Sequence, residues 1–464
     1  MVFSSMVFLC IFLPAVFVLH LLLPGMRAKN AMLVLASLIF YAYGEPVYFL
    51  LLIGSSLMNY VAALAIGRWQ KGRKAALVSA VIMNLAILVI FKYTGFLIET
   101  TNSVLGLSLP VPEVRMPIGI SFFTFQAMSY VIDVYRGVTK AQSSFPRVLL
   151  YISFFPQLIA GPIVKYHDIA LEIDSRTVTT EGVSLGIRRF IAGLSKKVLI
   201  ANTMGLVADT LFNAPQLQIN GAGAWIGAVS YMLQIYFDFS GYSDMAIGLG
   251  WMFGFHFKEN FNYPYISGSI REFWQRWHIS LSGWFREYLY IPLGGNRKGK
   301  ARTVINKMIV FLFTGIWHGA AVNFLFWGIY HGCFLMLEEY IPAIREKGGR
   351  VKSLFQHVYA LLVVCIGFVF FRAETMSQGI FWVKEMFTGF GWNASAMSLV
   401  VQQLTPVYLV TLAAGIAASL PLSQHWKKHK GYNTAACVVS LAGLALCILS
   451  LAGGTYNPFI YFRF

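Results

Sequence analysis

Long apolar segments follow one another along almost the whole chain, and they limit what it can fold into. The first covers residues 2–23 and is long enough to span a bilayer, which takes about 20 residues. It has no basic stretch before it, so we interpret it as a span and not as a cleavable signal peptide. Charged residues make up 12% of the chain, against about 25% in soluble proteins. Only a chain solvated by lipid carries so few charges, and we predict a polytopic integral membrane protein.

The remaining apolar segments vary in length, and Pro and Gly interrupt two of them. The segments are residues 31–42, 47–66, 75–91, 117–134, 148–163, 183–212, 222–255, 304–317, 320–337, 358–371, 400–420 and 433–451. The interruptions are Pro117-Ile-Gly119, and Pro156 with Gly161-Pro162. At membrane depth, irregular backbone survives only against protein or a water-filled cavity. We therefore predict one all-α membrane domain over residues 1–464, with about ten to twelve helices, some re-entrant or interfacial, around a polar interior.

Basic residues alternate from loop to loop. They gather after the first, third and fifth apolar segments, as Arg27 and Lys29, then Arg68, Lys71, Arg73 and Lys74, then Arg136, Lys140 and Arg147. Because basic loops stay in the cytoplasm, this pattern predicts an extracytoplasmic N-terminus in a multi-pass protein of the cytoplasmic (inner) membrane. The net charge of +17 then reflects cytoplasmic loops and lipid contact, and we expect no nucleic-acid partner.

Three polar clusters interrupt the apolar sequence, and polar groups inside hydrocarbon are costly enough to indicate function. The first places Asp238 and Asp244 in an otherwise apolar run over residues 236–250. Such aspartates line a tunnel or support a catalytic histidine. The alternative is a structural network with the neighbouring Tyr and Ser hydroxyls.

The second cluster covers residues 271–298. At helical spacing Trp274, Trp277 and His278 share one face, which is typical of a helix lying in the membrane interface. A surface anchor explains the tryptophans but not His278, because a neutral imidazole on an apolar face needs a hydrogen-bond partner. The Gly-Gly-Asn-Arg-Lys turn that follows suits a phosphate-bearing ligand.

The third cluster is Trp317-His318-Gly319, in the middle of a long apolar stretch. A histidine there is either a satisfied structural residue, as we expect for His331, or a general base towards a hydroxyl. The chain has no GxSxG, HExxH, Walker or CxxC motif, and its five cysteines have no metal-ligand spacing. The sequence therefore favours proton transfer centred on histidine, without a metal.

These motifs together resemble one family. Trp317-His318-Gly319, with His278 in a Trp-rich segment upstream, resembles the membrane-bound O-acyltransferase family. Residues 236–250, 285–299 and 315–319 resemble its bacterial alginate and peptidoglycan O-acetyltransferase branch, and residues 117–126 and 155–162 extend the similarity over nearly the whole chain. The resemblance implies a shallow ring of helices around a central funnel where donor and acceptor meet.

The resemblance also implies an activity and roles for residues. An acetyl group would move from a cytoplasmic thioester, acetyl-CoA or an acylated carrier protein, towards an extracytoplasmic cell-envelope or secreted polysaccharide. An extracytoplasmic acetyltransferase or esterase-like protein is the expected partner, and no permanently bound cofactor is expected. The family's catalytic histidine falls on His318. Its second position falls on His278, which would orient the substrate or stabilise the oxyanion. The funnel would be lined or supported by Trp274, Trp277, Trp317, Asp238 and Asp244, and charge alone assigns the donor phosphates to Arg297, Lys298, Lys300 and Arg302.

The chain ends in Phe459-Ile-Tyr461-Phe-Arg-Phe464, and relatives in this branch carry a similar aromatic tail. This tail is either an interfacial aromatic belt or a relay in which the Tyr461 phenol accepts the acyl group. Two other functions stay open. One is D-alanyl transfer to teichoic acid from a carrier protein, and the other is a proton-coupled transporter or flippase that uses the buried Asp and His residues.

Overall fold

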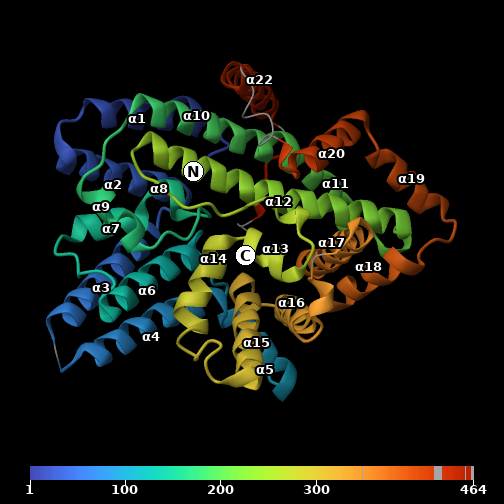
Figure 1. Cartoon of the computed structure of the whole chain (residues 1–464), viewed down its shortest axis with the longest axis horizontal. Coiled ribbons are helices and arrows are strands. Elements are labelled where there is room, and N and C mark those ends of the chain that lie inside the picture. Colours follow the sequence, from blue (N-terminus) through green and yellow to red (C-terminus); the bar gives the residue numbers. More distant parts are fainter. Residues whose placement is uncertain (70, 347, 423–430, 455, 461–464) are drawn as a thin grey trace. The chain divides into compact units, whose positions relative to one another are not determined.

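The structure is a computed structural model that describes residues 1–69, 71–346, 348–422, 431–454 and 456–460 (Figure 1). These residues form helices joined by turns and loops, and none of them lies in a β-strand. The prediction of an all-α protein is therefore confirmed. Contacts divide the chain into two compact units: unit 1 is Met1–Phe190 with Ser243–Glu259, and unit 2 is Ile191–Tyr242 with Asn260–Phe464. The expectation of one membrane domain over residues 1–464 stays a prediction.

The helices follow each other closely in both units, and α10 and α12 contribute residues to each. Unit 1 contains η1 (Phe8–Phe12), α1 (Leu13–Leu22), α2 (Gly25–Gly44), α3 (Phe49–Arg68), α4 (Arg73–Lys92), α5 (Thr94–Leu105), α6 (Ile120–Arg136), α7 (Phe145–Ser153), α8 (Phe155–Leu158), α9 (Tyr166–Asp174) and most of α10 (Thr180–Ser195). Unit 2 contains η2 (Lys196–Ala201), α11 (Asn202–Phe212), η3 (Gln216–Gln218), most of α12 (Gly221–Met252), η4 (Pro264–Ile266), α13 (Ile270–Arg276), α14 (Ile279–Phe285), η5 (Arg286–Tyr290), α15 (Gly299–His318), α16 (Val322–Tyr340), η6 (Pro342–Ile344), α17 (Arg350–Arg372), α18 (Met376–Thr388), α19 (Ala394–Gln403), α20 (Pro406–Ala418) and α22 (Tyr432–Ala452).

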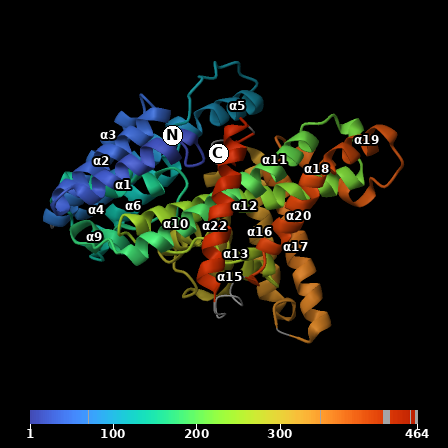
Figure 2. The same cartoon turned by 90° about the horizontal axis from the view of Figure 1, so that it is seen from above.

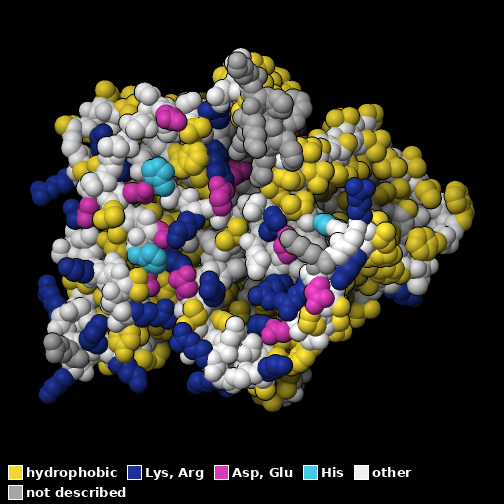
Figure 3. All heavy atoms as spheres, in the orientation of Figure 1, with side chains coloured by type: hydrophobic (Ala, Val, Ile, Leu, Met, Phe, Trp, Pro, Cys, Tyr) yellow, Lys and Arg dark blue, Asp and Glu magenta, His cyan; other side chains and the backbone are white. Residues whose placement is uncertain are grey.

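Several helices are long and apolar enough to cross a membrane. Among the described residues these are α3, α4, the continuous run Thr180–Phe212, α17 and α22. The pair α19 and α20 would add a sixth span, although it is bent by 70°. On the face that Figure 3 shows, hydrophobic side chains cover the region where Figure 1 draws α18 to α20. The prediction of a multi-pass membrane protein is confirmed.

In unit 1 the irregular backbone predicted at Pro117–Gly119 and around Gly161 is buried in protein. Gly119 begins α6 with φ +77, and a Cβ there would lie 2.8 Å from Leu158 O, so only glycine fits. Tyr151 Oη donates to the carbonyls of Gln126 and Val164, at 3.1 and 3.0 Å. Such contacts supply the non-helical backbone with protein partners, which lipid cannot provide.

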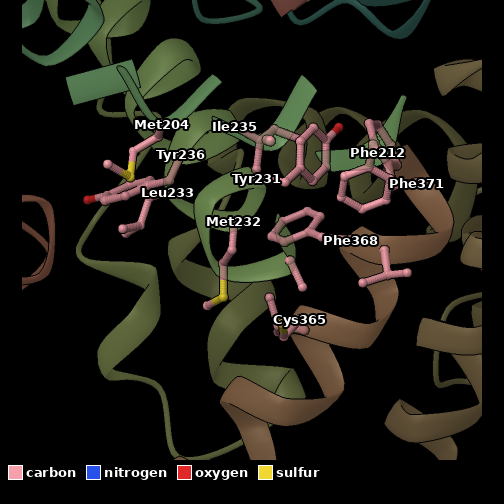
Figure 4. Close-up of a cluster of buried hydrophobic side chains, with 14 of the residues drawn as sticks. Met204, Phe212, Tyr231, Met232, Leu233, Ile235, Tyr236, Cys365, Phe368 and Phe371 are labelled. Carbon is pink, nitrogen blue, oxygen red and sulfur yellow. The ribbon is translucent and has the colours of Figure 1, made fainter. Parts of the chain in front are cut away.

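Unit 2 is built on a hairpin of α15 and α16, with α17 beside α16 (Figure 2). Gly315 and Gly328 face each other across the hairpin, and a Cβ on either would come within 3.0 Å of a backbone carbonyl of the other helix. A core of aromatic and sulfur side chains from α11, α12 and α17 packs nearby, including Phe212, Tyr231 and Phe368 (Figure 4). Close helix contact and a filled core fix the position of His318, the last residue of α15.

Candidate active site

His278 lies at a break in the Trp-rich segment. The sequence pattern predicts one helix there, but the structure divides it into α13 and α14, seven residues each, with Trp277 and His278 between them. His278 has φ 44 and ψ 53, in the left-handed region. That conformation costs a non-glycine residue about 1–2 kcal/mol, and such strain concentrates at functional sites. Local periodicity could not predict the break, because contacts from a distant segment hold it open.

Asn260 provides those contacts and also sets the tautomer of His278. Asn260 Oδ1 accepts from the Ser280 backbone N–H at 3.1 Å, and the Asn260 carbonyl accepts from Ile279 N–H at 3.0 Å. A backbone N–H can only donate, so the side-chain atom that it meets is the amide oxygen. His278 Nδ1 lies 3.2 Å from the same oxygen and must therefore carry the proton. In the neutral ring, Nε2 then holds the lone pair.

The surroundings of His278 keep its ring neutral. The side chain is fully buried, and Phe239 meets it edge-on with ring centroids 4.6 Å apart. His278 lies outside the long apolar helices, and burial lowers its pKa to about 3. A neutral imidazole with a fixed tautomer accepts a hydrogen bond from a hydroxyl at one defined atom.

His318 is 3% exposed and sits in an aromatic cage. Trp317, Trp327 and Phe371 surround it with ring centroids 4.9, 5.0 and 5.1 Å away. Trp317 also reaches His278, at 6.0 Å, so one indole contacts both imidazoles. The structure therefore brings together two histidines that are forty positions apart in the sequence.

The other two predicted tryptophans lie in the same aromatic network. Trp274 contacts Trp327 and His331, with ring centroids 5.6 and 5.3 Å apart, and Trp277 stacks on Phe273 at 5.4 Å. His331 is buried against these rings, and its structural role stays a prediction. A site so lined excludes water and strengthens every electrostatic interaction inside it.

A cavity of about 300 Å³, which we call the Arg271 cavity, opens in unit 2 beside α13 to α16. Its wall includes the basic side chains Arg271, Arg286, Lys307 and Arg345, and the acidic side chains Glu338 and Glu339. Glu338 accepts from the backbone N–H groups of Ile270 and Arg271, and Glu339 pairs with Lys307. Figure 3 shows basic and acidic side chains gathered over this region of unit 2. The cavity therefore has a basic excess suited to an anionic ligand.

The basic residues that charge alone assigned to donor phosphates lie beside this cavity. Arg297 and Lys298 are in the turn before α15, and Lys300 and Arg302 are in its first turn, all exposed. Of this turn, Asn296 reaches the cavity wall. The role of the turn in donor binding stays a prediction, while Lys307 and Arg345 in the wall were missed by sequence reasoning.

A second cavity of about 300 Å³, the Asp209 cavity, lies elsewhere in unit 2. Asp209 and Arg372 form an ion pair at 2.7 Å in its wall, beside Asn323 and Glu374. Phe371, which touches His318, also lines it. The sequence did not predict this cavity, and Arg372, at the end of an apolar segment, was not singled out.

The two cavities lie at opposite ends of α17. Arg345 in the Arg271 cavity precedes α17, and Arg372 in the Asp209 cavity is its last residue. A helix of 23 residues is about 35 Å long at 1.5 Å per residue, close to the thickness of the hydrocarbon core. On α15, Lys307 to Thr314 line the first cavity, and Ala321, just after His318, lines the second. In the sequence His318 thus falls between Thr314 in the first wall and Ala321 in the second, and it lines neither cavity itself.

The two aspartates of the first polar cluster separate in the structure. Asp238 forms a buried pair with Lys197 at 2.7 Å in unit 2, whereas Asp244 pairs with Arg189 at 2.8 Å in unit 1. Phe239, the residue after Asp238 in α12, contacts His278. Tyr461, the candidate relay residue, lies outside the described residues. Ile460, the residue before it, is buried and lines the Asp209 cavity.

Comparison with known proteins decides the family. Residues 115–376, more than half of the chain, match the model of MBOAT, the membrane-bound O-acyltransferase family. The chain belongs to this family. The matched residues include His278, His318 and most of both cavities. This membrane-bound O-acyltransferase is therefore an enzyme, as the sequence predicted.

Its relatives include both O-acetyltransferases and D-alanyltransferases. The probable alginate O-acetylase of Pseudomonas putida is 40% identical over 100% of both chains. The peptidoglycan O-acetyltransferase of Helicobacter pylori is 35% identical over 83% of this chain and 80% of its own. The teichoic acid D-alanyltransferase of Bacillus subtilis is 29% identical over 55% of this chain and 69% of its own. The membrane-bound O-acyltransferase thus resembles the O-acetyltransferases over more of its length.

Proposed function

We propose that this enzyme moves an acetyl group from a cytoplasmic thioester to an extracytoplasmic polysaccharide of the cell envelope or a secreted one. The observation that carries the proposal is the pair of cavities in unit 2, one with Arg345 before α17 in its wall and one with Arg372 at the end of α17, together with the Phe371 ring that lines the second cavity and contacts His318. Such an arrangement lets donor and acceptor approach one residue from two sides of a membrane. Acetyl is favoured over D-alanyl because the acetyltransferase relatives are more similar and match more of the chain.

The charge pattern supports a cytoplasmic opening for the Arg271 cavity. Its wall joins the basic turn through Asn296, and basic turns stay on the cytoplasmic side. The protein would then be a multi-pass protein of the cytoplasmic membrane, with its N-terminus extracytoplasmic. Acetyl-CoA and an acylated carrier protein both carry phosphate groups, and the arginines of the cavity wall could bind them in bidentate fashion.

The proposed reaction is acyl transfer with histidine as general base. The oxygen of an attacking hydroxyl forms a bond to the thioester carbonyl carbon, and His318 takes the proton from that hydroxyl. The carbon–sulfur bond then breaks, and the departing thiolate takes the proton from the imidazolium. His278, with its lone pair on Nε2, orients the hydroxyl by accepting its hydrogen bond and has no N–H left to stabilise an oxyanion. General-base catalysis contributes about 10²–10⁴-fold, and positioning of both substrates supplies the rest.

The chain's end supports a relay through Tyr461. Ile460 donates its N–H to Asp238, one residue from Phe239 at the His278 ring. In the relay, the Tyr461 phenol takes the acyl group from the thioester and releases the thiol. A hydroxyl of the polymer, or of an extracytoplasmic acetyltransferase-like partner, then takes the acyl group and restores the phenol. The donor would thus never cross the membrane.

The test is acyl transfer to purified, detergent-solubilised protein from radiolabelled acetyl-CoA, with an acylated carrier protein as the second donor. Wild type would be compared with His318→Ala, Tyr461→Phe and the control His256→Ala, an exposed histidine of unit 1. We expect label on wild type and on the control, and none on the other two. Label on His318→Ala would rule out His318 as the general base. Label on Tyr461→Phe would keep the enzyme and remove the relay.

A further inference from the structure

The ion pair between Lys197 and Asp238 is the most deeply buried one in the described part of unit 2. Their side chains are 4% and 2% exposed, and Lys197 Nζ lies 2.7 Å from Asp238 Oδ1. Burying both charges is costly unless further hydrogen bonds satisfy them, and a pair of apolar residues is often as stable. Stability alone therefore does not explain why the chain buries this ion pair. The proposed acyl transfer also assigns no role to Lys197.

The C-terminal segment supplies the missing hydrogen bonds. Lys197 Nζ donates to the carbonyl of Pro458, and Asp238 Oδ2 accepts from the N–H of Ile460 at 2.7 Å. The ammonium, the carboxylate and two backbone groups of the tail thus close a ring of contacts. Both hydrogen bonds use main-chain atoms of the tail, and Pro458 contributes the one polar backbone group that proline has. The Phe459 ring also lies near Lys197, with its centroid 6.0 Å from Nζ.

Local structure brings Lys197 and Asp238 together. Lys197 lies in η2, a π-helical stretch, and such stretches often mark functional sites. Opposite it on α12 stands Gly241, where a Cβ would lie 2.7 Å from Gly193 O and 3.2 Å from Lys197 N. The glycine that follows Asp238 by three positions thus allows the close approach that the ion pair needs.

A second set of contacts holds the start of the same segment. Tyr456 Oη donates to Asp209 Oδ2, while Asp209 Oδ1 pairs with Arg372 at 2.7 Å. Asn202 Nδ2 donates to Asn457 Oδ1 at 3.3 Å. Gly205 leaves room for the Tyr456 ring against α11, since a Cβ there would lie 3.3 Å from it. The segment 456–460 is therefore fixed at both of its ends.

The last described residue of the fixed segment is connected to the surroundings of both histidines through intervening residues. Ile460 lines the Asp209 cavity together with Phe371, the neighbour of His318. Its N–H partner Asp238 is adjacent to Phe239, the neighbour of His278. The next covalently attached residue is Tyr461.

We propose that Lys197 and Asp238 are positioning residues that clamp the backbone of the C-terminal segment 456–460 and so hold Ile460, the residue to which Tyr461 is bonded. The inference deepens the proposed function and rests on it only for the activity readout. A purely structural pair would matter for folding alone, whereas a clamp depends on which charge faces the tail carbonyl and which faces the tail N–H.

Three full-length variants separate these roles. Lys197→Met with Asp238→Leu replaces the pair by apolar side chains of similar size, which commonly preserves folding. Lys197→Asp with Asp238→Lys keeps an ion pair but turns a carboxylate towards the Pro458 carbonyl and an ammonium towards the Ile460 N–H. Ile460→Pro removes the tail donor and leaves the pair intact, and Ile460→Val is its matched control. The readouts are the melting temperature, hydrogen–deuterium exchange of the amides in residues 456–460, and label transfer.

The charge exchange decides most directly. We expect its tail amides to exchange at least about 10-fold faster and label transfer to be lost, and we expect its melting temperature to fall because both buried charges lose their hydrogen bonds to the tail. Wild-type exchange in the charge-exchanged or apolar protein would overturn the clamp. If the charge-exchanged protein does not fold, Ile460→Pro decides. If the Phe459 amide exchanges faster in Ile460→Pro than in Ile460→Val, the clamp is supported. Equal exchange of that amide in the two variants overturns it. Because exchange is measured without substrate, these outcomes do not depend on the proposed activity.

Discussion

At the scale of single residues, Asn260 controls the chemistry of His278. One amide oxygen accepts from Ser280 N–H, from Ser280 Oγ at 2.9 Å and from His278 Nδ1. It therefore holds the left-handed backbone of His278 and the tautomer of its ring together. Asn260 is fully buried, and we expect it to act through the histidine.

We predict that Asn260→Ala lowers the rate of acyl transfer by about 10-fold or more, because the ring loses its fixed tautomer and orientation. The variant also leaves a buried N–H without its acceptor, which costs about 1–3 kcal/mol of stability. Label transfer at saturating donor and the melting temperature measure the two effects.

A buried asparagine elsewhere provides the control. Asn59 in α3 exchanges hydrogen bonds with Asn84 in α4, at 3.1 and 2.8 Å, within unit 1. Asn59→Ala should lower the melting temperature by a similar amount and leave the transfer rate per folded molecule unchanged. Equal losses of rate in both variants would mean that Asn260 acts through stability alone.

At the scale of elements, the hairpin of α15 and α16 sets the position of His318. Its glycines permit helix contact at backbone distance, and His318 ends α15 only one turn after Gly315. A displacement of α15 therefore moves the histidine within its aromatic cage.

We predict that Gly315→Ala destabilises the protein by about 1–3 kcal/mol, as overpacking does, and lowers transfer more than the melting shift explains. The reason is that the new Cβ would meet the carbonyl of Phe324, which the backbone cannot yield without separating the helices. Thermal melting in detergent and label transfer would be measured on the same preparations.

The matched substitution is Gly54→Ala in α3, where a Cβ would have nothing within 4 Å. Replacing a helical glycine there should be neutral or stabilise by about 0.5–1 kcal/mol. If Gly315→Ala behaves in the same way, the close contact does not position His318.

At the scale of the whole molecule, the proposed function places donor binding in the Arg271 cavity of unit 2. We predict that Arg271→Gln with Arg345→Gln raises the KM for the donor by at least about 10-fold, because each lost charge-assisted hydrogen bond is worth about 1.5–3 kcal/mol. The rate at saturating donor should stay close to wild type, since neither side chain lies at the histidines. Initial rates over a range of donor concentrations and of salt check this.

The basic turn supplies the competing variant, Lys298→Gln with Lys300→Gln. Both side chains are exposed and lie outside the wall of the Arg271 cavity. A smaller effect on KM than that of the cavity variant is expected. If the turn variant has the larger effect, the assignment made from charge alone is right and the cavity wall is not the phosphate site.

Much of this protein was predictable from its sequence. Apolar segments of bilayer length determined a helical membrane protein, because lipid leaves backbone groups no partner outside the helix. The segment Gly315–Gly319 and the Trp-rich stretch at His278 indicated the family, which comparison confirms. The orientation of the N-terminus, the donor and the relay at Tyr461 remain predictions.

Only the tertiary structure decided how these parts meet. The predicted helix is interrupted at His278, and Asp238 and Asp244 lie in different units. Asp238 pairs with Lys197 and accepts a hydrogen bond from Ile460. These contacts join residues far apart in sequence, and periodicity reports only on neighbours along one helix. The sequence determined which polar groups would be too costly to leave in lipid, and long-range packing determined which partner each of them found.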